Sequence, residues 1–89
     1  MSDLTVMDFG ATWCGPCKMM EPIFNRMKEK HPDVVFEKYD IDTDGTKGFE
    51  IRSVPYFVFK KGDKIIHEQI GVLNLIHFDA YINKFKETV

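Results

Sequence analysis

Two cysteines three positions apart are the residues of this chain best suited to chemistry. Cys14 and Cys17 are the only cysteines among 89 residues. An apolar run precedes them and a helical pattern follows them, so they are expected at a strand-to-helix junction. The unpaired N–H groups and the dipole of a helix N-terminus stabilise an anion, which favours the thiolate form of Cys14. The pair therefore predicts a dithiol that forms and breaks a disulfide.

The spacing predicts different surroundings for the two thiols. We expect Cys14 at or just before the first helical turn, exposed to solvent, as the attacking thiol. Cys17 lies one turn later and faces inward with the apolar residues, as the shielded thiol that resolves a mixed disulfide. Pro16 suits the first turn because no hydrogen-bond donor is needed there, and it stiffens the loop between the two sulfurs.

Metal binding is the main alternative use of such cysteines. Zinc takes four ligands, but the chain has no second cysteine pair and its three histidines lie far from the motif at no ligand spacing. The series Asp40, Asp42, Asp44 and Gly45 begins like an EF-hand calcium loop, but Ile51 stands where that loop needs glutamate. We therefore interpret the acidic segment as a turn. A cysteine protease would need a positioned histidine, which the Cys-x-x-Cys spacing gives no reason to expect.

Length and composition predict one folded domain, residues 1–89. Hydrophobic residues make up 44% of the chain and include eight phenylalanines, as in globular proteins. The net charge is −2 and the longest basic run is Lys60-Lys61, so binding to nucleic acid or to an anionic membrane has no electrostatic support. Neither a signal peptide nor a membrane span is expected. The predicted compartment is the cytoplasm, where paired cysteines are more often catalytic or metal-binding than structural.

Hydrophobic periodicity predicts an α/β fold with the order βαβ followed by ββα. The expected strands are residues 4–9, 34–39, 56–59 and 64–70; a helix that kinks at Pro22 runs from residue 16 to Pro32, and a last helix capped by Asn74 buries Leu75, Phe78, Ile82 and Phe85. A short helical turn is expected at 49–52. The parallel pair of the first unit and the hairpin of the second give one mixed four-stranded sheet flanked by helices.

The segment Trp13-Cys14-Gly15-Pro16-Cys17-Lys18 resembles the active-site signature of the thioredoxin family. The resemblance covers almost the whole chain, through Asp8-Phe9 before the motif, Pro22 in the helix, Lys38 in the next strand, Val54-Pro55 before the hairpin and Gly71 after it. The Gly-Pro dipeptide is more similar to thioredoxins than to glutaredoxins, and the glycine pair that glutaredoxins place near Gly71 is absent. The resemblance implies a minimal thioredoxin fold with sheet order 2-1-3-4, lacking the usual N-terminal strand and helix.

The resemblance also implies roles for residues near the cysteines. The other residues of the strand that holds Asp8 are almost all apolar, and desolvation there raises the pKa of a carboxyl group. The alternative is that Asp8 ends the strand, where it is solvated or caps a turn. By resemblance it is the buried base that takes the proton from Cys17, with Lys38 close by as its charge partner. Pro55 is expected in the cis form against the cysteines, which leaves the backbone of Val54 to pair with an extended substrate.

The substrate-binding surface follows from the same resemblance. Trp13 is expected to form a rim for the partner protein. The other expected members are Gly15, Pro16, Val54, Pro55 and Gly71. An apolar stretch, Val72, Leu73, Leu75 and Ile76, is expected mostly in the core, with one or two members extending the docking surface. Gly10 stands where thioredoxins usually have an aromatic residue, so part of the hydrophobic wall beside the thiols is missing.

The predicted function is the reduction of protein disulfides by the Cys14–Cys17 dithiol, which serves electron transport and cell redox homeostasis. No bound cofactor is needed. The expected partners are disulfide-containing proteins and a thioredoxin reductase-type electron donor, and the protein is expected to be a monomer. The alternatives are glutaredoxin-like or isomerase activity, or a thioredoxin-fold binding module whose dithiol is only a redox-sensitive contact.

Overall fold

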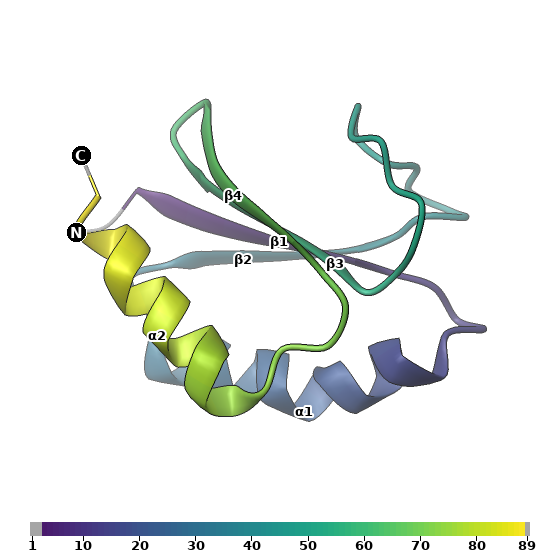
Figure 1. The fold of residues 1–89 in the computed structure, drawn as a ribbon, viewed down its shortest axis with the longest axis horizontal. Coiled ribbons are helices and arrows are strands. Elements are labelled where there is room, and N and C mark those ends of the chain that lie inside the picture. The colour runs from purple at the N-terminus through teal and green to yellow at the C-terminus, as the bar shows by residue number, and fades with distance from the viewer. Residues whose placement is uncertain (1–2, 89) are drawn as a thin grey trace.

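The computed structural model describes residues 3–88, which form one four-stranded sheet and two helices. The elements in chain order are β1 (Leu4–Gly10), α1 (Gly15–Lys30), β2 (Val35–Asp40), β3 (Tyr56–Lys61), β4 (Lys64–Ile70) and α2 (Leu75–Lys86). The strand order in the sheet is β2-β1-β3-β4 (Figure 1). β1 runs parallel to β2, and the other two neighbouring pairs are antiparallel. The mixed sheet and its predicted order are therefore confirmed.

Strand β1 lies in the middle of the sheet, and it carries the chain to the cysteines. All its residues except Thr5 are buried, as predicted for a strand covered on both faces. Side chains alternate along a strand, so Asp8 lies on the same face as Leu4 and Val6, which pack in the larger core. The register places Asp8 beside Lys38 of β2. The carboxyl group is thus directed to the helical side of the sheet.

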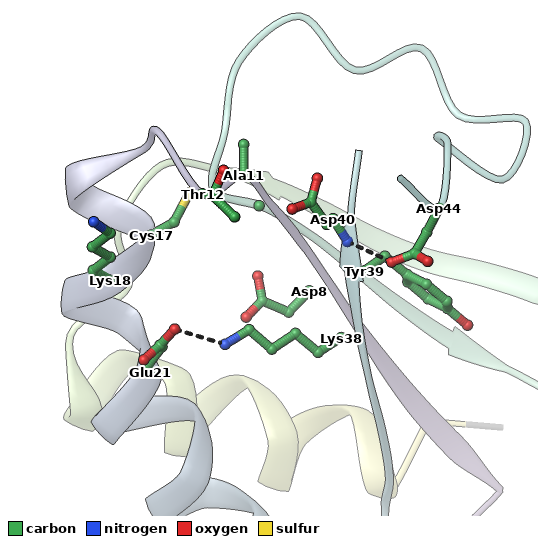
Figure 2. A pocket seen from close by; sticks show the side chains of 11 residues that line it. Asp8, Ala11, Thr12, Cys17, Lys18, Glu21, Lys38, Tyr39, Asp40 and Asp44 are labelled. Carbon is green, nitrogen blue, oxygen red and sulfur yellow. Dashed lines mark hydrogen bonds and ion pairs between the residues drawn. The ribbon is translucent and has the colours of Figure 1, made fainter. Parts of the chain in front are cut away.

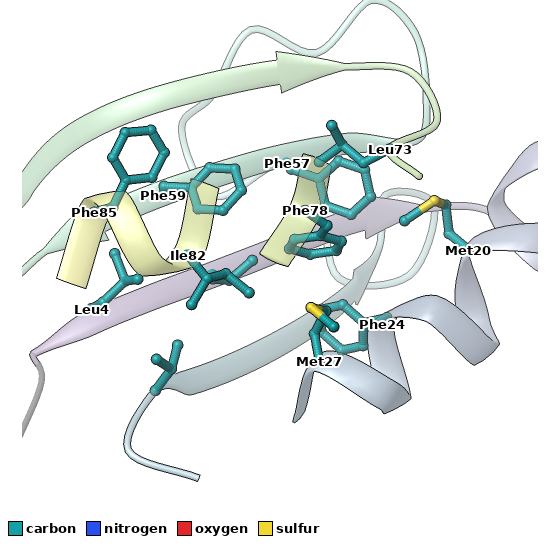
Figure 3. Packing of buried hydrophobic residues seen from close by; sticks show 12 residues of the cluster. Leu4, Met20, Phe24, Met27, Phe57, Phe59, Leu73, Phe78, Ile82 and Phe85 are labelled. Atoms are coloured by element: carbon teal, nitrogen blue, oxygen red, sulfur yellow. The ribbon is translucent and has the colours of Figure 1, made fainter. Parts of the chain in front are cut away.

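Both helices lie on one side of the sheet, and a long segment covers part of the other side (Figure 1). The larger core is formed by the helices and the facing residues of β1 and β3, among them Phe24, Phe57, Phe59, Phe78 and Ile82 (Figure 3). The opposite face carries a smaller cluster of Met7, Phe9, Tyr56 and Val58, against which Ile41, Phe49 and Ile51 pack. Each face of β1 is thereby buried.

Helix α1 begins at the motif because Cys14 caps it and Pro16 fits the first turn. Its inward stripe of Met20, Phe24 and Met27 is buried, as the helical spacing predicts. The helix continues through Pro22 as one element and ends at Lys30, before Pro32. Cys17 is therefore carried on a long helix whose core face anchors it to the sheet.

Three expectations about local structure are wrong. Residues 49–52 form no helical turn, because Lys47 and Gly48 have left-handed backbone angles and Phe49 and Ile51 pack on the smaller cluster. Leu75 is 41% exposed and does not join the core face of α2. Of the apolar stretch before and within the start of α2, only Leu73 is buried, while Val72 and Ile76 are exposed. The residues that α2 buries begin at Phe78 and continue with Ile82 and Phe85.

Candidate active site

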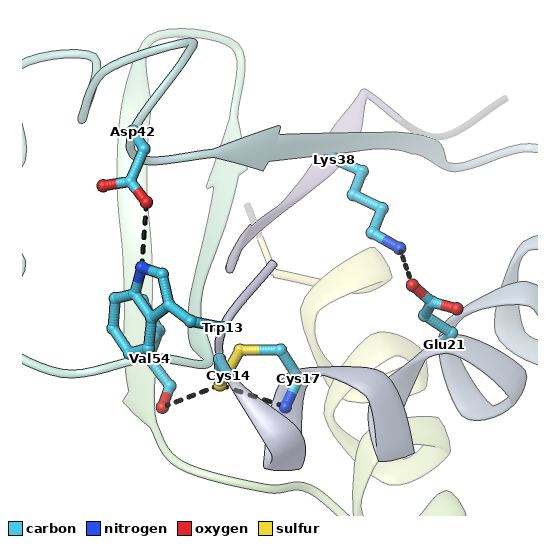
Figure 4. The surroundings of a disulfide bond; sticks show 7 residues. All are labelled: Trp13, Cys14, Cys17, Glu21, Lys38, Asp42 and Val54. Carbon is cyan, nitrogen blue, oxygen red and sulfur yellow. Dashed lines mark hydrogen bonds and ion pairs between the residues drawn. A yellow bond between two sulfur atoms is a disulfide. The ribbon is translucent and has the colours of Figure 1, made fainter. Parts of the chain in front are cut away.

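The two cysteines form a disulfide at the N-terminus of α1 (Figure 4). Their Cα atoms are 5.3 Å apart. Cys14 is the N-cap residue, with extended backbone angles, and its Sγ accepts a hydrogen bond of 3.1 Å from the N–H of Cys17. This N–H is one of the helix donors that lack a partner within the helix. The helix terminus thus stabilises a negative charge on the Cys14 sulfur through this hydrogen bond and through the helix dipole.

The expected difference in exposure between the cysteines is wrong. Cys14 is 5% exposed and counts among the buried residues, whereas Cys17 is partly exposed. The reason lies in their neighbours. The Sγ of Cys14 lies 3.7 Å from the carbonyl oxygen of Val54, while Cys17 faces Gly10, which has no side chain to cover it. What sets Cys14 apart is therefore its position at the helix terminus and not greater exposure.

The segment before β3 lies directly against the disulfide. The Val54–Pro55 peptide bond is cis, as the resemblance implied. The carbonyl oxygen of Pro55 accepts a hydrogen bond of 2.8 Å from the N–H of Gly71. Gly71 has a φ of 92°, a left-handed conformation that glycine adopts without strain. Gly71 is thereby joined to the segment whose Val54 carbonyl lies against Cys14.

Trp13 extends into solvent next to the disulfide. It is 68% exposed, and its Nε1 donates a hydrogen bond of 2.8 Å to Asp42 (Figure 4). The N–H of Asp42 in turn donates to Asp40, so the acidic turn is internally braced. Trp13 is therefore exposed beside the disulfide, and its role as a rim for a partner protein stays a prediction. Its partner Asp42 was missed, because the acidic segment alone indicates a turn and gives no sign of what it contacts.

Asp8 is a buried carboxyl group on the helical side of the sheet. It is 4% exposed, and burial raises its pKa from the ordinary 3.8 to about 6. The positive charge of Lys38 opposes this rise, and the negative charge of Glu21 adds to it. Asp8 and Cys17 line the same cavity, of about 460 Å³ (Figure 2). A carboxyl group with this pKa exchanges protons near neutral pH.

Lys38 lies near Asp8, but its ion pair is with Glu21. The Nζ of Lys38 is 3.1 Å from Oε1 of Glu21, and both side chains are about half exposed (Figure 2). The sequence analysis did not identify Glu21. Its position four residues after Cys17 could have shown that it shares the helix face of that cysteine.

Opposite changes in the pKa of Asp8 are expected when either member of this ion pair loses its charge. Glu21→Gln should lower the pKa of Asp8, because it removes a negative charge and frees Lys38. Lys38→Met should raise it. The pKa can be measured by following the NMR signal of the Asp8 carboxyl carbon against pH. The control is Glu29→Gln, which removes an exposed charge from the helix that carries Glu21 and should leave the pKa of Asp8 unchanged. A shift in the same direction for both variants would contradict this electrostatic arrangement.

No cluster of three or more His, Cys, Asp or Glu side chains within residues 3–88 is arranged to hold a metal ion. Two carboxylates of the acidic turn accept hydrogen bonds within it: Asp44 from the N–H of Asp40, and Asp40 from the N–H of Asp42. In the same range, neither helix has the length and apolar character that crossing a membrane requires.

Comparison with known proteins identifies the family of this chain. The sequence profile of the family described as Thioredoxin matches residues 1–84. The chain belongs to the thioredoxin family. It is 48% identical over 84 residues to the thioredoxin of Ovis aries, in a match covering 91% of this chain and 78% of that one. With the thioredoxin of Ophiophagus hannah it shares 47% identity over 72 residues, which cover 79% of this chain and 69% of that one.

The fold comparison leads to the same family. The oxidised form of mitochondrial thioredoxin 3 from Saccharomyces cerevisiae superposes with a TM-score of 0.83 at 38% identity, covering 94% of this chain and 80% of that chain. The predicted fold is therefore confirmed as the thioredoxin fold. As a member of the family with its Cys14–Cys17 pair in place, the chain is a thiol–disulfide oxidoreductase that reduces protein disulfides. Thioredoxins act on disulfide-containing proteins and are themselves reduced by thioredoxin reductase.

Proposed function

We propose that Cys14 is the attacking thiol and Cys17 the resolving thiol in the reduction of protein disulfides. The observation that carries this assignment is the N-cap position of Cys14, where its sulfur accepts the N–H of Cys17. The Cys14 thiolate bonds to one sulfur of the target and expels the other as a thiolate. Cys17 then attacks the Cys14 sulfur, forms the internal disulfide and releases the reduced target.

Asp8 is proposed as the proton acceptor for Cys17. The resolving thiol must lose its proton before it attacks, and a nearby base near neutral pKa makes this loss easier. The support for this role is the burial of Asp8, its pKa of about 6 and its place in the cavity that Cys17 also lines. Lys38 is proposed as its charge partner, and the lowering effect of Lys38 on the pKa of Asp8 supports that role.

The proposed substrate surface surrounds the disulfide and consists of Trp13, Gly15, Pro16, Val54, Pro55 and Gly71. Its support is the exposure of Trp13, Gly15 and Pro16, together with the contact between the Val54 carbonyl and Cys14. We include exposed Val72 as an apolar extension next to Gly71. An extended target segment would lie along the backbone at Val54, as in strand addition.

The cellular setting is proposed from the same reasoning. Residues 1–89 act as one domain and as a monomer, which a thioredoxin reductase-type donor returns to the dithiol state without a cofactor bound to this chain. The proposed location is the cytoplasm, where such a donor keeps thiols reduced. In this setting the protein takes part in electron transport and cell redox homeostasis.

The test of this function is turnover on a protein disulfide. With dithiothreitol as the electron source, the protein should accelerate the reduction of insulin, and Cys14→Ser should abolish the acceleration. Precipitation of the released insulin chain measures the rate. An inactive intact protein would refute the proposed reductase role and leave a redox-sensitive binding module. Full activity of Cys14→Ser would refute the assignment of the attacking thiol.

A further inference from the structure

Glu21 places a carboxylate on the helix that carries Cys17. It follows Cys17 by four residues in α1, so the two side chains share one face of the helix. Both line the cavity of about 460 Å³, together with Asp8 of β1 and Lys38 of β2 (Figure 2). Three elements thus bring the resolving thiol, its proposed base and an ion pair to one cavity.

The backbone directs Lys38 toward Asp8, but its ammonium group is bound elsewhere. The register of the parallel strands β1 and β2 pairs Asp8 with Lys38, and side chains at matched positions extend to the same face. The ammonium group therefore starts from a position beside the carboxyl group of Asp8. Within residues 3–88 its ion pair is instead with Glu21, at 3.1 Å between Nζ and Oε1. Glu21 thus competes with Asp8 for the charge of Lys38.

The other charges around the cavity act less directly on Asp8. Four more charged groups lie in the lining or against it: Lys18, Asp40, Asp44 and Lys47. Lys18 is exposed on α1, and Lys47 is exposed with its ammonium group 5.0 Å from the centre of the Tyr39 ring. The carboxylates of Asp40 and Asp44 accept backbone N–H groups of the acidic turn. None of these four groups is among the charges that shift the pKa of Asp8.

Lys38 and Glu21 are the charges that do act on Asp8, and they act in opposite directions. Burial raises the pKa of Asp8 to about 6, the charge of Lys38 lowers it, and the charge of Glu21 raises it. A direct ion pair between Lys38 and Asp8 would strengthen the lowering effect, because the attraction between charges grows as their distance falls. A carboxylate with a lower pKa is a weaker base for the thiol of Cys17.

We propose that Glu21 is a positioning residue for the step in which Cys17 releases the reduced target. By holding the ammonium group of Lys38 at the helix surface, Glu21 keeps Asp8 free of an ion pair and preserves its strength as a base. The proposal rests on the role proposed above for Asp8. In this step the Cys17 thiol gives its proton to the Asp8 carboxylate, and its thiolate attacks Sγ of Cys14. The bond between Cys14 and the target breaks, and the target sulfur leaves with the electron pair as a thiolate.

The resolving step can be timed by itself with a coloured aromatic disulfide. The reduced protein is mixed with dithiobis(nitrobenzoic acid) in a stopped-flow instrument at several reagent concentrations. Attack by the first thiol releases one coloured thiolate at a rate that rises with reagent concentration, whereas the attack of Cys17 releases the second at a rate that does not. In the unaltered protein this second rate should fall as the pH drops through about 6, where Asp8 becomes protonated.

Glu21→Gln should move the midpoint of this fall to lower pH by roughly half a pH unit. The loss of its negative charge and the release of Lys38 both lower the pKa of Asp8. The rate above the midpoint should drop roughly twofold, because the base is weaker. Glu29→Gln, which removes an exposed charge from the same helix, is the matched control and should keep both midpoint and rate. A midpoint that stays in place or rises in Glu21→Gln would overturn the proposal.

A double variant separates the positioning role of Glu21 from the direct effect of its charge. If Glu21 acts by holding Lys38, Glu21→Gln should shift the midpoint less when Lys38→Met is already present than in the unaltered protein. Equal shifts in the two backgrounds would overturn the positioning role. Both side chains of the pair are about half exposed, so the variants should fold.

Asp8→Asn distinguishes a failure of this proposal from a failure of the role on which it rests. If Asp8 is the base, the fall in the second rate near pH 6 should be absent in Asp8→Asn. Its absence there, together with an unmoved midpoint in Glu21→Gln, refutes only the role of Glu21. A fall that persists in Asp8→Asn refutes the proposed role of Asp8, and the role of Glu21 with it.

Discussion

Cys17→Ser is expected to stop turnover and to leave the protein covalently joined to its target. Cys14 still attacks a target disulfide in this variant, but a serine hydroxyl cannot displace it from the mixed disulfide. The joined species should be visible as a one-to-one adduct by intact-protein mass spectrometry, and dithiothreitol should release it. Insulin reduction in multiple turnovers should fall to the rate without protein.

The matched variant for this experiment is Cys14→Ser, which leaves only Cys17. An ordinary cysteine with a pKa of about 8.5 is only about 3% thiolate at pH 7, whereas the helix terminus raises the thiolate fraction of Cys14. Cys14→Ser should therefore form the adduct at least about tenfold more slowly. If the adduct forms faster with Cys14→Ser than with Cys17→Ser, Cys17 is the attacking thiol and Cys14 the resolving one.

Asp8→Asn is expected to stabilise the fold and to slow the reaction. Folding raises the pKa of Asp8 from 3.8 to about 6, so the folded state favours the protonated group. This contribution to stability is fully present below pH 3.8 and is lost as the pH rises through about 6. The rise in the pKa of Asp8 corresponds to a loss of about 3 kcal/mol of stability at pH 8, where the buried group is ionised. An asparagine of similar size is uncharged and avoids this loss. The free energy of unfolding should therefore rise by about 2–3 kcal/mol at pH 8 and change little at pH 3.5.

The rate measurement separates a catalytic role of Asp8 from a purely structural one. If Asp8 accepts the proton of Cys17, Asp8→Asn should slow insulin reduction at pH 7 by about tenfold or more. Asp63→Asn, at an exposed turn, should alter neither stability nor rate. An unchanged rate at neutral pH would remove Asp8 from the mechanism, and an unchanged stability at pH 8 would contradict a buried charge at this position.

The order of the elements, the sheet and the position of the disulfide follow from local sequence patterns. The predicted strand and helices are confirmed because local pattern and fold agree in three places: the apolar run at 4–9, the helical stripe after Pro16 and the cap at Asn74. The burial of Asp8 was also recognisable, because its neighbours in the central strand are almost all apolar. The segment at 49–52 was predicted incorrectly, since packing on Phe9 and Tyr56 outweighs its local preference.

The remaining site features depend on neighbours that are distant in sequence. Cys14 is covered by the Val54 carbonyl, forty residues away, and Cys17 is uncovered because Gly10 lacks a side chain. The partner of Lys38 is set by the distance between α1 and β2, which periodicity does not specify. Exposure and pairing of this kind are properties of the assembled sheet and helices, whereas strand and helix formation are properties of short segments.

The exposed indole of Trp13 also gives this protein a natural optical probe. Trp13 is the only tryptophan of the chain, adjacent in sequence to Cys14 and held in solvent by Asp42. Its fluorescence therefore reports on one place, the edge of the disulfide. A target that covers this edge removes water from the ring and shifts the emission to shorter wavelength, whatever the state of the sulfurs. The docking of a target can thus be timed in the unlabelled protein.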